Sequence, residues 1–444
     1  MKPVKINHNQ GDLLRSRLSN QLNPKHELYV LSSKIAWNVV EDEYSDLYAD
    51  NVKGGCPPKP VRLVVGLFLL QYLHNLSDEA VVRTWVENPY WQYFCGYDYL
   101  QWQFPMDPSS LTRWRSRLGK ERLDSILSLT VKAGIDLCVI TQKDCESVIV
   151  DTTVMPKNIA FPTDSRLFNK SRERMTKLAK KHDIPLRQNY NLVAKTLSRK
   201  IGGYLHAKQM KRASAAIKKM KTYMGRVMRD IERKIAGDSI LQTIFKTELE
   251  KAQRLCHQTK ASKNKLYSLH EPDVQCISKG KAHKRYEFGC KASFVITHKK
   301  GKGFVLAAEA LQENPYDGHT LKQALNLSEK ITTVKPTKAF VDLGYKGNNA
   351  SDTDTEIWFS RQKRGVTNKI RKEIKRRQAI EPYLGHMKSE CKLDRCRLSG
   401  IQGDQAHAIL VAAGYNLRLI LNHLRKLLLP IFWMLLYGLN VSCA

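Results

Sequence analysis

Three carboxylates in this chain of 444 residues stand where metal-dependent chemistry could use them. Asp151 interrupts an apolar, β-branched stretch at 147–154, and Asp342 closes a second such stretch at 337–342. A charge inside a buried strand is costly unless it has a partner. If the two strands are sheet neighbours, their carboxylates meet at one edge and suit Mg²⁺, which binds carboxylates together with phosphate oxygens. Two such ions, or Mn²⁺ in their place, activate the attacking oxygen and stabilise the leaving oxygen in phosphodiester transfer.

A third carboxylate is expected from the helix that follows the last strand. Glu381 stands there, four residues after Arg377 and seven residues before Lys388. On one continuous helix these side chains share a face, which predicts a metal-binding carboxylate between two phosphate-binding cations. Pro382 disfavours helical backbone at the residue before it, so we expect the helix to kink or begin at Glu381. The alternative is a surface helix with ordinary ion pairs.

These carboxylates need a mixed α/β framework to bring them together. Apolar and β-branched runs predict strands at 147–154, 286–297, 304–310, 337–342 and 356–360. A helix pattern at 319–332 precedes the second aspartate, and the chain reads as helical from Asn368 onwards. At the start of the first of these helices, Asp317 and His319 either line the site or, for Asp317, cap the helix.

A long basic insertion separates the first strand from the second. The chain carries a formal net charge of +32, which attracts polyanions, and nucleic acid is the default partner. Residues 165–260 hold 25 Lys and Arg against seven Asp and Glu, a surplus of 18. Apolar residues recur at helical spacing over 213–235 and again over 240–249, after a break at 237–238. We predict a helical hairpin that follows the DNA backbone, with its apolar seam packed inside the hairpin.

Two short basic segments are also expected to contact DNA. The first is a helix opened by a polar cap at Asp107, and it resembles a helix-turn-helix recognition element. The second leads from the last strand towards Glu381, where contact with the DNA backbone is favoured over a solvated face. For the first helix, a solvated basic surface is the alternative. The cations concerned are Arg113, Arg115 and Arg117 in the first segment, and Arg361, Lys363 and Arg364 in the second.

Composition excludes several classes of protein. Hydrophobic residues make up 42% of the chain, enough for real cores, so wholesale disorder is excluded. No apolar segment follows the N-terminal charges as in a secretory signal. The longest apolar runs, 63–70 and 427–436, are shorter than the roughly 20 residues that a bilayer span needs. The ten cysteines include no Cys-x-x-Cys pair, which favours free thiols in a reducing cytoplasm over a zinc site.

In combination, these motifs resemble those of the DDE transposases of bacterial insertion sequences, whose catalytic domain is ribonuclease H-like. The resemblance rests on Val-Asp-Thr-Thr at Asp151, Val-Asp-Leu-Gly-Tyr-Lys-Gly at Asp342 and Arg-Arg-Gln-Ala-Ile-Glu-Pro at Glu381. The related signature of Tyr, Arg, Glu and Lys fits around Glu381, except that Ile374 stands at the tyrosine position. The resemblance implies that the three carboxylates are catalytic and hold two Mg²⁺ ions, with Arg377 and Lys388 on DNA phosphates.

The resemblance also implies a reaction and its partners. The protein would nick DNA at the terminal inverted repeats of an element and join the 3′-hydroxyls to target DNA, without a covalent protein–DNA intermediate. It would act as a homodimer on DNA, associated with the nucleoid in a bacterial cytoplasm and with no membrane partner. Two alternatives remain: a non-cutting or inactivated DNA-binding protein, and another ribonuclease H-like nuclease.

The expected fold class is α/β, with a ribonuclease H-like mixed sheet and flanking helices. We expect an N-terminal helical domain at 1–120 that binds the DNA ends. The catalytic domain would combine 121–164 with 272–430, interrupted by the basic helical insertion at 165–271. An apolar tail would complete the chain at 431–444.

Overall fold

The computed structural model describes residues 14–48, 58–259, 261–278, 285–301, 303–347, 349–350 and 354–437. The chain divides into two compact units. Unit 1 comprises residues 1–156 and 290–444, and unit 2 comprises residues 157–289. Each unit has a hydrophobic core of its own.

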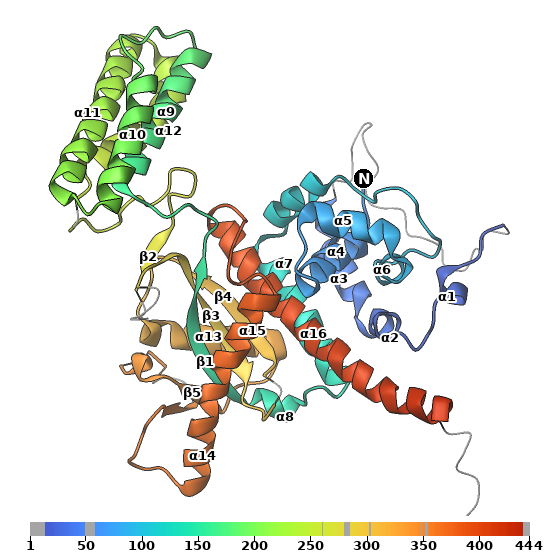
Figure 1. Ribbon diagram of the computed structural model, residues 1–444. Coiled ribbons are helices and arrows are strands. Elements are labelled where there is room, and N and C mark those ends of the chain that lie inside the picture. Colours follow the sequence, from blue (N-terminus) through green and yellow to red (C-terminus); the bar gives the residue numbers. More distant parts are fainter. Residues whose placement is uncertain are drawn as a thin grey trace, which may run out of the picture. The chain divides into compact units, whose positions relative to one another are not determined.

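Unit 1 is built on a mixed sheet (Figure 1). Its strands are β1 (Ser147–Pro156), β3 (Glu287–Thr297), which begins in unit 2, β4 (Val305–Leu311), β5 (Lys338–Val341) and β6 (Glu356–Phe359). They lie in the order β4, β3, β1, β5, β6, with β5 parallel to both β1 and β6, and with β3 and β4 antiparallel. Parallel strands are covered on both faces, which explains the nearly continuous apolar runs of β1 and β5.

Helices of unit 1 precede the first strand, lie between later strands and follow the last strand in the chain. The first set is α1 (Leu18–Gln21), α2 (Glu27–Lys34), α3 (Trp37–Glu43), η1 (Ser45–Leu47), α4 (Val61–Leu73), α5 (Asp78–Glu87), α6 (Pro89–Phe94), α7 (Pro108–Asp136) and α8 (Gln142–Cys145). The second set is α13 (Asp317–Thr332), η2 (Leu343–Tyr345), α14 (Asn368–Arg376), η3 (Arg377–Ala379), α15 (Ile380–Glu390) and α16 (Gly400–Tyr437).

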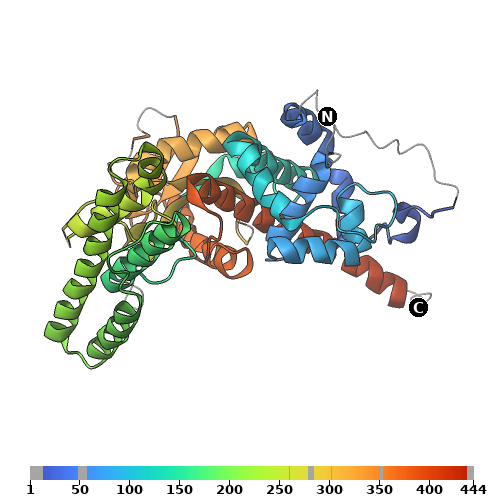
Figure 2. The same ribbon diagram turned by 90° about the horizontal axis from the view of Figure 1, so that it is seen from above.

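One hydrophobic core joins the N-terminal helices to the sheet. Helix α16 packs against α7, α4 and β4, so segments from both ends of the chain hold the sheet (Figures 1 and 2). Helix α4 is buried along nearly its whole length, as its apolar sequence requires. Helix α7 consists of two helical segments that meet at Gly119, where a φ of 67° suits a residue without a Cβ atom.

Unit 2 is a group of four helices with a short strand. The elements are α9 (Asp164–Lys181), α10 (Asn191–His206), α11 (Met210–Ile235), α12 (Ser239–His257) and β2 (Gln275–Ile277), which pairs antiparallel with residues 287–289. The helices lie side by side around a core that includes Met220, Met224 and Phe245 (Figures 1 and 2). The Asp238 side chain accepts hydrogen bonds from the first backbone N–H groups of α12, which explains the break after α11.

The expected strands and the helices around them are present, with ends that differ by a few residues. Ser77 and Asp107 accept backbone hydrogen bonds at the starts of α5 and α7, as their cap positions predicted. The predicted hairpin is present as α11 and α12. We did not predict α9 and α10, which cover the same core, or the short strand β2.

The predicted insertion at 165–271 lies within unit 2, and the helices of the predicted N-terminal range share the core of unit 1. Residues 1–13 and 49–57 of that range, and residues 438–444 of the predicted tail, lie outside the described residues. Over the part of the chain that is described, no helix has both the length and the apolar character needed to cross a membrane.

Candidate active site

Two of the three predicted carboxylates belong to neighbouring parallel strands. The register pairs Ser147 with Lys338 and Ile149 with Phe340. Continued by two residues, this register brings Asp151 level with Asp342, just beyond the end of β5. The strands are therefore neighbours, which was the condition for the two carboxylates to meet, and both acids lie level at the point where β5 ends.

A single arginine joins these two aspartates. The Arg377 guanidinium donates a hydrogen bond to Asp151 at 3.0 Å and lies 3.7 Å from a carboxylate oxygen of Asp342. Its side chain is buried, whereas that of Asp342 is half exposed. Two carboxylates at one sheet edge repel each other, so a cation between them stabilises the arrangement. We predicted that Arg377 contacts DNA; in this structure it is the counter-ion of the aspartate pair.

Asp342 is held in its ionised form. Partial burial by itself raises the pKa of this carboxyl group, but hydrogen bonds from the Ser360 hydroxyl and the Leu343 N–H, together with neighbouring positive charges, outweigh that effect. The hydroxyl lies 2.7 Å and the N–H 2.8 Å from the same oxygen, and the charges of Arg377 and Arg361 act in the same direction. The pKa of Asp342 therefore lies below its ordinary value, which keeps an anionic oxygen available at neutral pH.

A further carboxylate, Asp317, lies beside Asp151. The Thr152 hydroxyl donates to Asp317 at 2.9 Å, while the Thr152 N–H donates to Asp151 at 2.8 Å. The buried Lys291 ammonium donates to the same Asp317 oxygen at 3.0 Å and to the Pro315 carbonyl. Asp317 is also the first residue of α13, but its side chain makes these contacts with β1 and β3. Of the two roles that the sequence left open for Asp317, the contacts favour lining the site.

A buried hydroxyl that we did not predict lies beside Asp151, Asp317 and Asp342, which we call the carboxylate cluster. Tyr345 is fully buried, and its hydroxyl has no hydrogen-bond partner in the described structure. Burial raises the pKa of Tyr345 well above its ordinary value, and the charges of Asp151, Asp317 and Asp342 add to that rise. Tyr345 is therefore a neutral hydrogen-bond donor beside three carboxylates. Its only sequence signal was its place in the Asp-Leu-Gly-Tyr segment after the second aspartate.

The third predicted carboxylate stands on an almost continuous helix formed by α14, η3 and α15. The 3₁₀ turn at Arg377–Ala379 comes directly before α15, consistent with Pro382, which offers no N–H to the carbonyl four residues earlier. Glu381 is exposed on the first turn of α15. Among the described residues, no group of three or more His, Cys, Asp or Glu side chains is gathered closely enough to hold a metal ion. The structure thus brings Asp151 and Asp342 together and does not add Glu381 to them.

The predicted DNA-contacting cations differ in exposure. Arg361, Lys363 and Arg364 are exposed after β6, and Lys388 is partly exposed on α15. Arg113 and Arg117 are exposed on α7, whereas Arg115 between them is buried. The Arg115 guanidinium donates to Asp78 at 2.5 and 2.8 Å and to Gln71 at 2.7 Å. Because these bonds use both of its terminal nitrogens, Arg115 stabilises the fold and does not face DNA in this arrangement.

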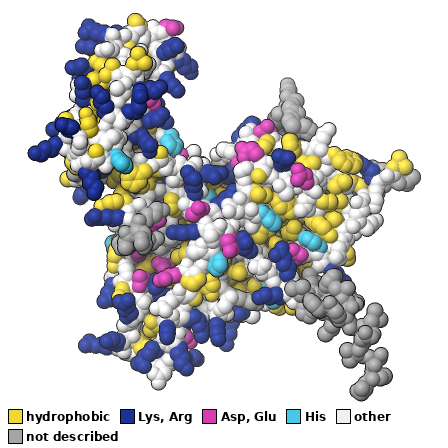
Figure 3. All heavy atoms as spheres, viewed as in Figure 1, with side chains coloured by type: hydrophobic (Ala, Val, Ile, Leu, Met, Phe, Trp, Pro, Cys, Tyr) yellow, Lys and Arg dark blue, Asp and Glu magenta, His cyan; other side chains and the backbone are white. Residues whose placement is uncertain are grey.

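Basic side chains cover unit 2 as well. Figure 3 shows Lys and Arg gathered over the helices α9–α12. The exposed cations of α11 are Lys211, Arg212, Lys218, Lys219, Arg226, Arg229, Arg233 and Lys234. The apolar seam of α11 faces the core of the unit, so the charges occupy its solvent side.

Comparison with known proteins gives two family matches. Residues 16–117 match a family described as "Transposase domain (DUF772)", and residues 352–421 match a family described as "Transposase DDE domain". The second match includes Glu381, whereas Asp151 and Asp342 precede it.

The chain is also similar to "Uncharacterized protein ORF8 in nfe locus" of Rhizobium meliloti, with 41% identity over 209 residues. That alignment covers 47% of this chain and 100% of the relative. No solved structure matches the chain.

Proposed function

The chain belongs to the DDE transposases of the insertion-sequence type, and on that premise we propose that it cuts element ends and joins the 3′-hydroxyls to target DNA. The observation that carries this proposal is the pair Asp151 and Asp342, level on parallel strands and joined by Arg377. Two carboxylates at one sheet edge are an arrangement that a structural role alone does not require.

The chemistry of Asp151 and Asp342 fits divalent metal ions, although Glu381 does not join this pair in the structure. The donor set consists of carboxylate oxygens, which Mg²⁺ and Mn²⁺ prefer, and the pair already shares one cationic group. We assign Asp151, Asp342 and Glu381 as the ligands of two Mg²⁺ ions, or of Mn²⁺. When bound, such ions activate the attacking oxygen and stabilise the leaving oxygen of a phosphodiester.

The chain's own residues would orient the reactants. Ser360 and the Leu343 N–H hold Asp342 ionised, and Thr152 fixes the Asp151 carboxylate through its N–H. Once Arg377 leaves the aspartates, its guanidinium and the ammonium of Lys388 can bind phosphates next to the cut bond. The exposed cations Arg361, Lys363 and Arg364 extend that contact along the DNA backbone.

The rest of the molecule supports binding of DNA over a larger area. We propose that Arg113 and Arg117 on α7 contact element ends, and we leave Arg115 out because it is bonded to Asp78. The basic surface of unit 2 would follow the DNA backbone. We further propose a ribonuclease H-like catalytic domain at 121–164 and 272–430, an end-binding domain at 1–120, and a homodimer that pairs the inverted repeats. We also propose that the protein acts on the bacterial nucleoid.

The test is Mg²⁺-dependent nicking of DNA that carries the element's ends. Asp151→Ala is expected to lower cutting at least about 100-fold, because it removes a metal ligand. Asp151→Asn serves as a second variant, since it keeps the shape of the side chain. Asp354→Ala removes an exposed carboxylate that pairs with Lys335 before the starts of the parallel strands β5 and β6, whereas Asp342 follows the end of β5, so this variant should cut like wild type.

Unchanged cutting by both Asp151 variants would refute the site assignment. Wild-type binding of DNA without any cutting would favour the non-cutting DNA-binding protein. Cutting without dependence on the ends would favour another nuclease of the same fold. Short inverted repeats and a target duplication beside the gene would support transposition.

A further inference from the structure

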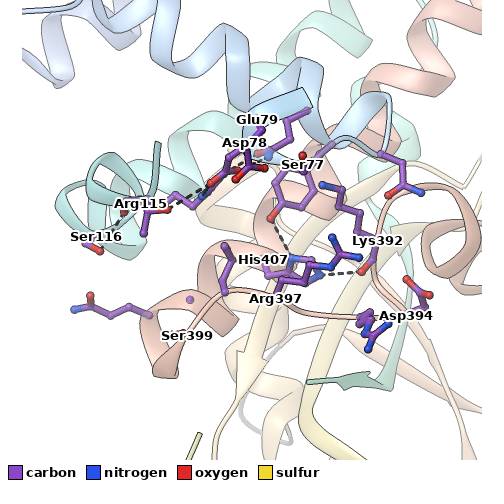
Figure 4. Close-up of a pocket in the computed structure, with 18 residues that line it drawn as sticks. Ser77, Asp78, Glu79, Arg115, Ser116, Lys392, Asp394, Arg397, Ser399 and His407 are labelled. Atoms are coloured by element: carbon purple, nitrogen blue, oxygen red, sulfur yellow. Dashed lines mark hydrogen bonds and ion pairs between the residues drawn. The ribbon is translucent and has the colours of Figure 1, made fainter. Parts of the chain in front are cut away.

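Unit 1 contains a pocket that none of the roles above uses (Figure 4). It has a volume of about 670 Å³ and lies between α4, the start of α5, α7 and the segment 392–407. These walls come from both family-matched regions, 16–117 and 352–421. The pocket is thus large enough for one nucleotide of a nucleic-acid backbone. Its walls belong to the two regions that match transposase families.

Cations dominate the part of the lining that is free to bind a ligand. Arg115 and Asp78 neutralise each other. The other charged residues of the lining are three cations, Lys392, Arg395 and Arg397, and two exposed acids, Glu79 and Asp394. In the described structure the guanidinium groups of Arg395 and Arg397 have no hydrogen bond or ion pair. The hydroxyl groups of Thr112, Ser116 and Ser399 add neutral donors to the lining.

Lys392 is the cation that the fold holds in place. Its ammonium group donates to the Leu76 carbonyl and lies over the Tyr72 ring, 5.6 Å from the centroid. Its backbone has a φ of 69°, a left-handed conformation that a residue with a Cβ atom adopts at a cost. Such strain persists only where neighbouring groups enforce it.

A buried histidine enforces that backbone. One ring nitrogen of His407, Nε2, lies 3.0 Å from the Lys392 carbonyl oxygen, and the other, Nδ1, lies 3.0 Å from the Tyr72 hydroxyl. Because a carbonyl only accepts, Nε2 carries the proton and Nδ1 accepts from Tyr72. Figure 4 shows His407, Lys392 and Arg397 among the residues that line the pocket. Buried groups therefore fix the position of Lys392.

The electrostatics of Lys392 favour an anion. Burial lowers the pKa of Lys392 to about 8, although Asp78 raises it; Arg115 and Arg397 lower it further, and Glu79 acts in the opposite direction. Charging Lys392 in the free protein therefore costs free energy, chiefly through burial and also through repulsion from Arg115 and Arg397. A bound anion would lower that cost.

We propose that this pocket binds a phosphate group of the DNA backbone through Lys392, Arg397 and Arg395. The inference rests on the proposed function, because it makes the pocket a second contact for DNA held at the carboxylate cluster. Helix α15 leads from Glu381 past Lys388 to the pocket loop, a distance of about 15 Å at 1.5 Å per residue. DNA that passes Glu381 along this helix would bring a phosphate a few base pairs away from the cut to the pocket.

The test is binding of a short labelled duplex by the full chain in EDTA, at several salt concentrations. The double substitution Lys392→Gln with Arg397→Ala should weaken binding and lower the slope of log affinity against log salt by about 1, because the pocket then no longer neutralises its one phosphate. Arg397→Ala alone should lower the slope by less than the double substitution, and it removes no bond that holds the fold. Arg83→Ala removes an exposed cation that pairs only with Glu87, and its slope should equal that of wild type.

Inorganic phosphate, followed by its effect on the melting temperature, separates the two sources of the ligand. If the double variant keeps wild-type duplex binding, the proposal is overturned; loss of phosphate stabilisation alone would then assign the pocket to a free phosphate compound. Because no metal is present, cutting plays no part in this measurement. Failure of the proposed cutting activity is measured by the Mg²⁺-dependent nicking assay and failure of the pocket by this binding assay, so the two give different results.

Discussion

Two buried arginines in unit 1 are paired with aspartates, and the two pairs differ in how fully the polar atoms around each arginine are hydrogen-bonded. Arg115 joins residues from α4, α5 and α7, and its terminal nitrogens make hydrogen bonds of 2.5–2.8 Å with Asp78 and Gln71. Arg377 joins Asp151 in the middle of β1 to Asp342 just after the parallel strand β5, with one nitrogen at 3.0 Å and the other at 3.7 Å. Both leave Nε without an acceptor. Beside Arg377, however, the Tyr345 hydroxyl is also unpaired.

The difference agrees with a structural ion pair at Arg115 and, on the proposed function, with a ligand site at Arg377. A buried pair with satisfied partners stabilises one conformation, and breaking it is costly. A buried donor without an acceptor costs about 1–3 kcal/mol, which a bound ligand can recover. The Arg115 pair belongs to the first kind and the Arg377 pair to the second, although the sequence suggested the same role for both arginines.

The largest effect is expected from removing the carboxylate of the structural pair. Asp78→Ala leaves Arg115 buried without a charge partner, so the free energy of unfolding should fall by about 3–5 kcal/mol. Urea denaturation measures this loss. Glu79→Ala removes the exposed neighbour in the same helical turn and should change stability by less than about 0.5 kcal/mol. Similar losses for the two variants would contradict the structural role of the Arg115 pair.

Removing the other arginine should change metal binding more than folding. Arg377→Ala takes away the cation that competes for Asp151 and Asp342, so the affinity for Mn²⁺ without DNA should rise about tenfold. The Mn²⁺ titration can be followed by the paramagnetic resonance signal of the free ion. The metal-free variant should also melt at a lower temperature, because the two aspartates then lack a counter-ion.

Two matched variants sharpen this second test. Arg377→Lys keeps the charge and should bind Mn²⁺ nearly as wild type does. Arg361→Ala removes an exposed cation whose charge also acts on Asp342 and should raise the affinity much less. An Mn²⁺ affinity that falls in Arg377→Ala would show that the arginine supports the metal site and does not compete with it.

The sequence predicted the strands and the place of Asp151 and Asp342 because β-branched runs and their interruption are local signals. The structural role of Arg115 could also have been predicted from the amino-acid sequence. Leu111, Trp114 and Leu118 mark the buried stripe of α7, and Arg115 lies on it. Residues two positions apart on a helix point in different directions, so Arg113 and Arg115 cannot both face DNA.

Other features depend on contacts between distant segments. Asp317 is linked to Asp151 through Thr152, which stands 165 positions earlier in the chain, and no spacing rule connects them. The unpaired Tyr345 hydroxyl and the His407 support of Lys392 arise only when the helices and the sheet are packed together. A sequence pattern predicts which helix or strand a residue belongs to, whereas its hydrogen-bond partners from distant segments depend on tertiary packing.

The smallest effect is expected at the hydrogen bond that keeps Asp342 ionised. Because the pKa of Asp342 is lowered in the folded state, its contribution to stability is present above the unfolded pKa of about 4 and is lost as the pH falls through the folded value. Ser360→Ala should return the pKa towards its ordinary value and cost about 0.5 kcal/mol at pH 7, since the carboxylate is half exposed. The cost should shrink as the pH drops below about 4, which urea denaturation at a series of pH values can measure. Ser116→Ala, which removes an exposed hydroxyl on α7, should show no such trend. A cost that is constant with pH would mean that Ser360 stabilises the fold without acting on the charge of Asp342.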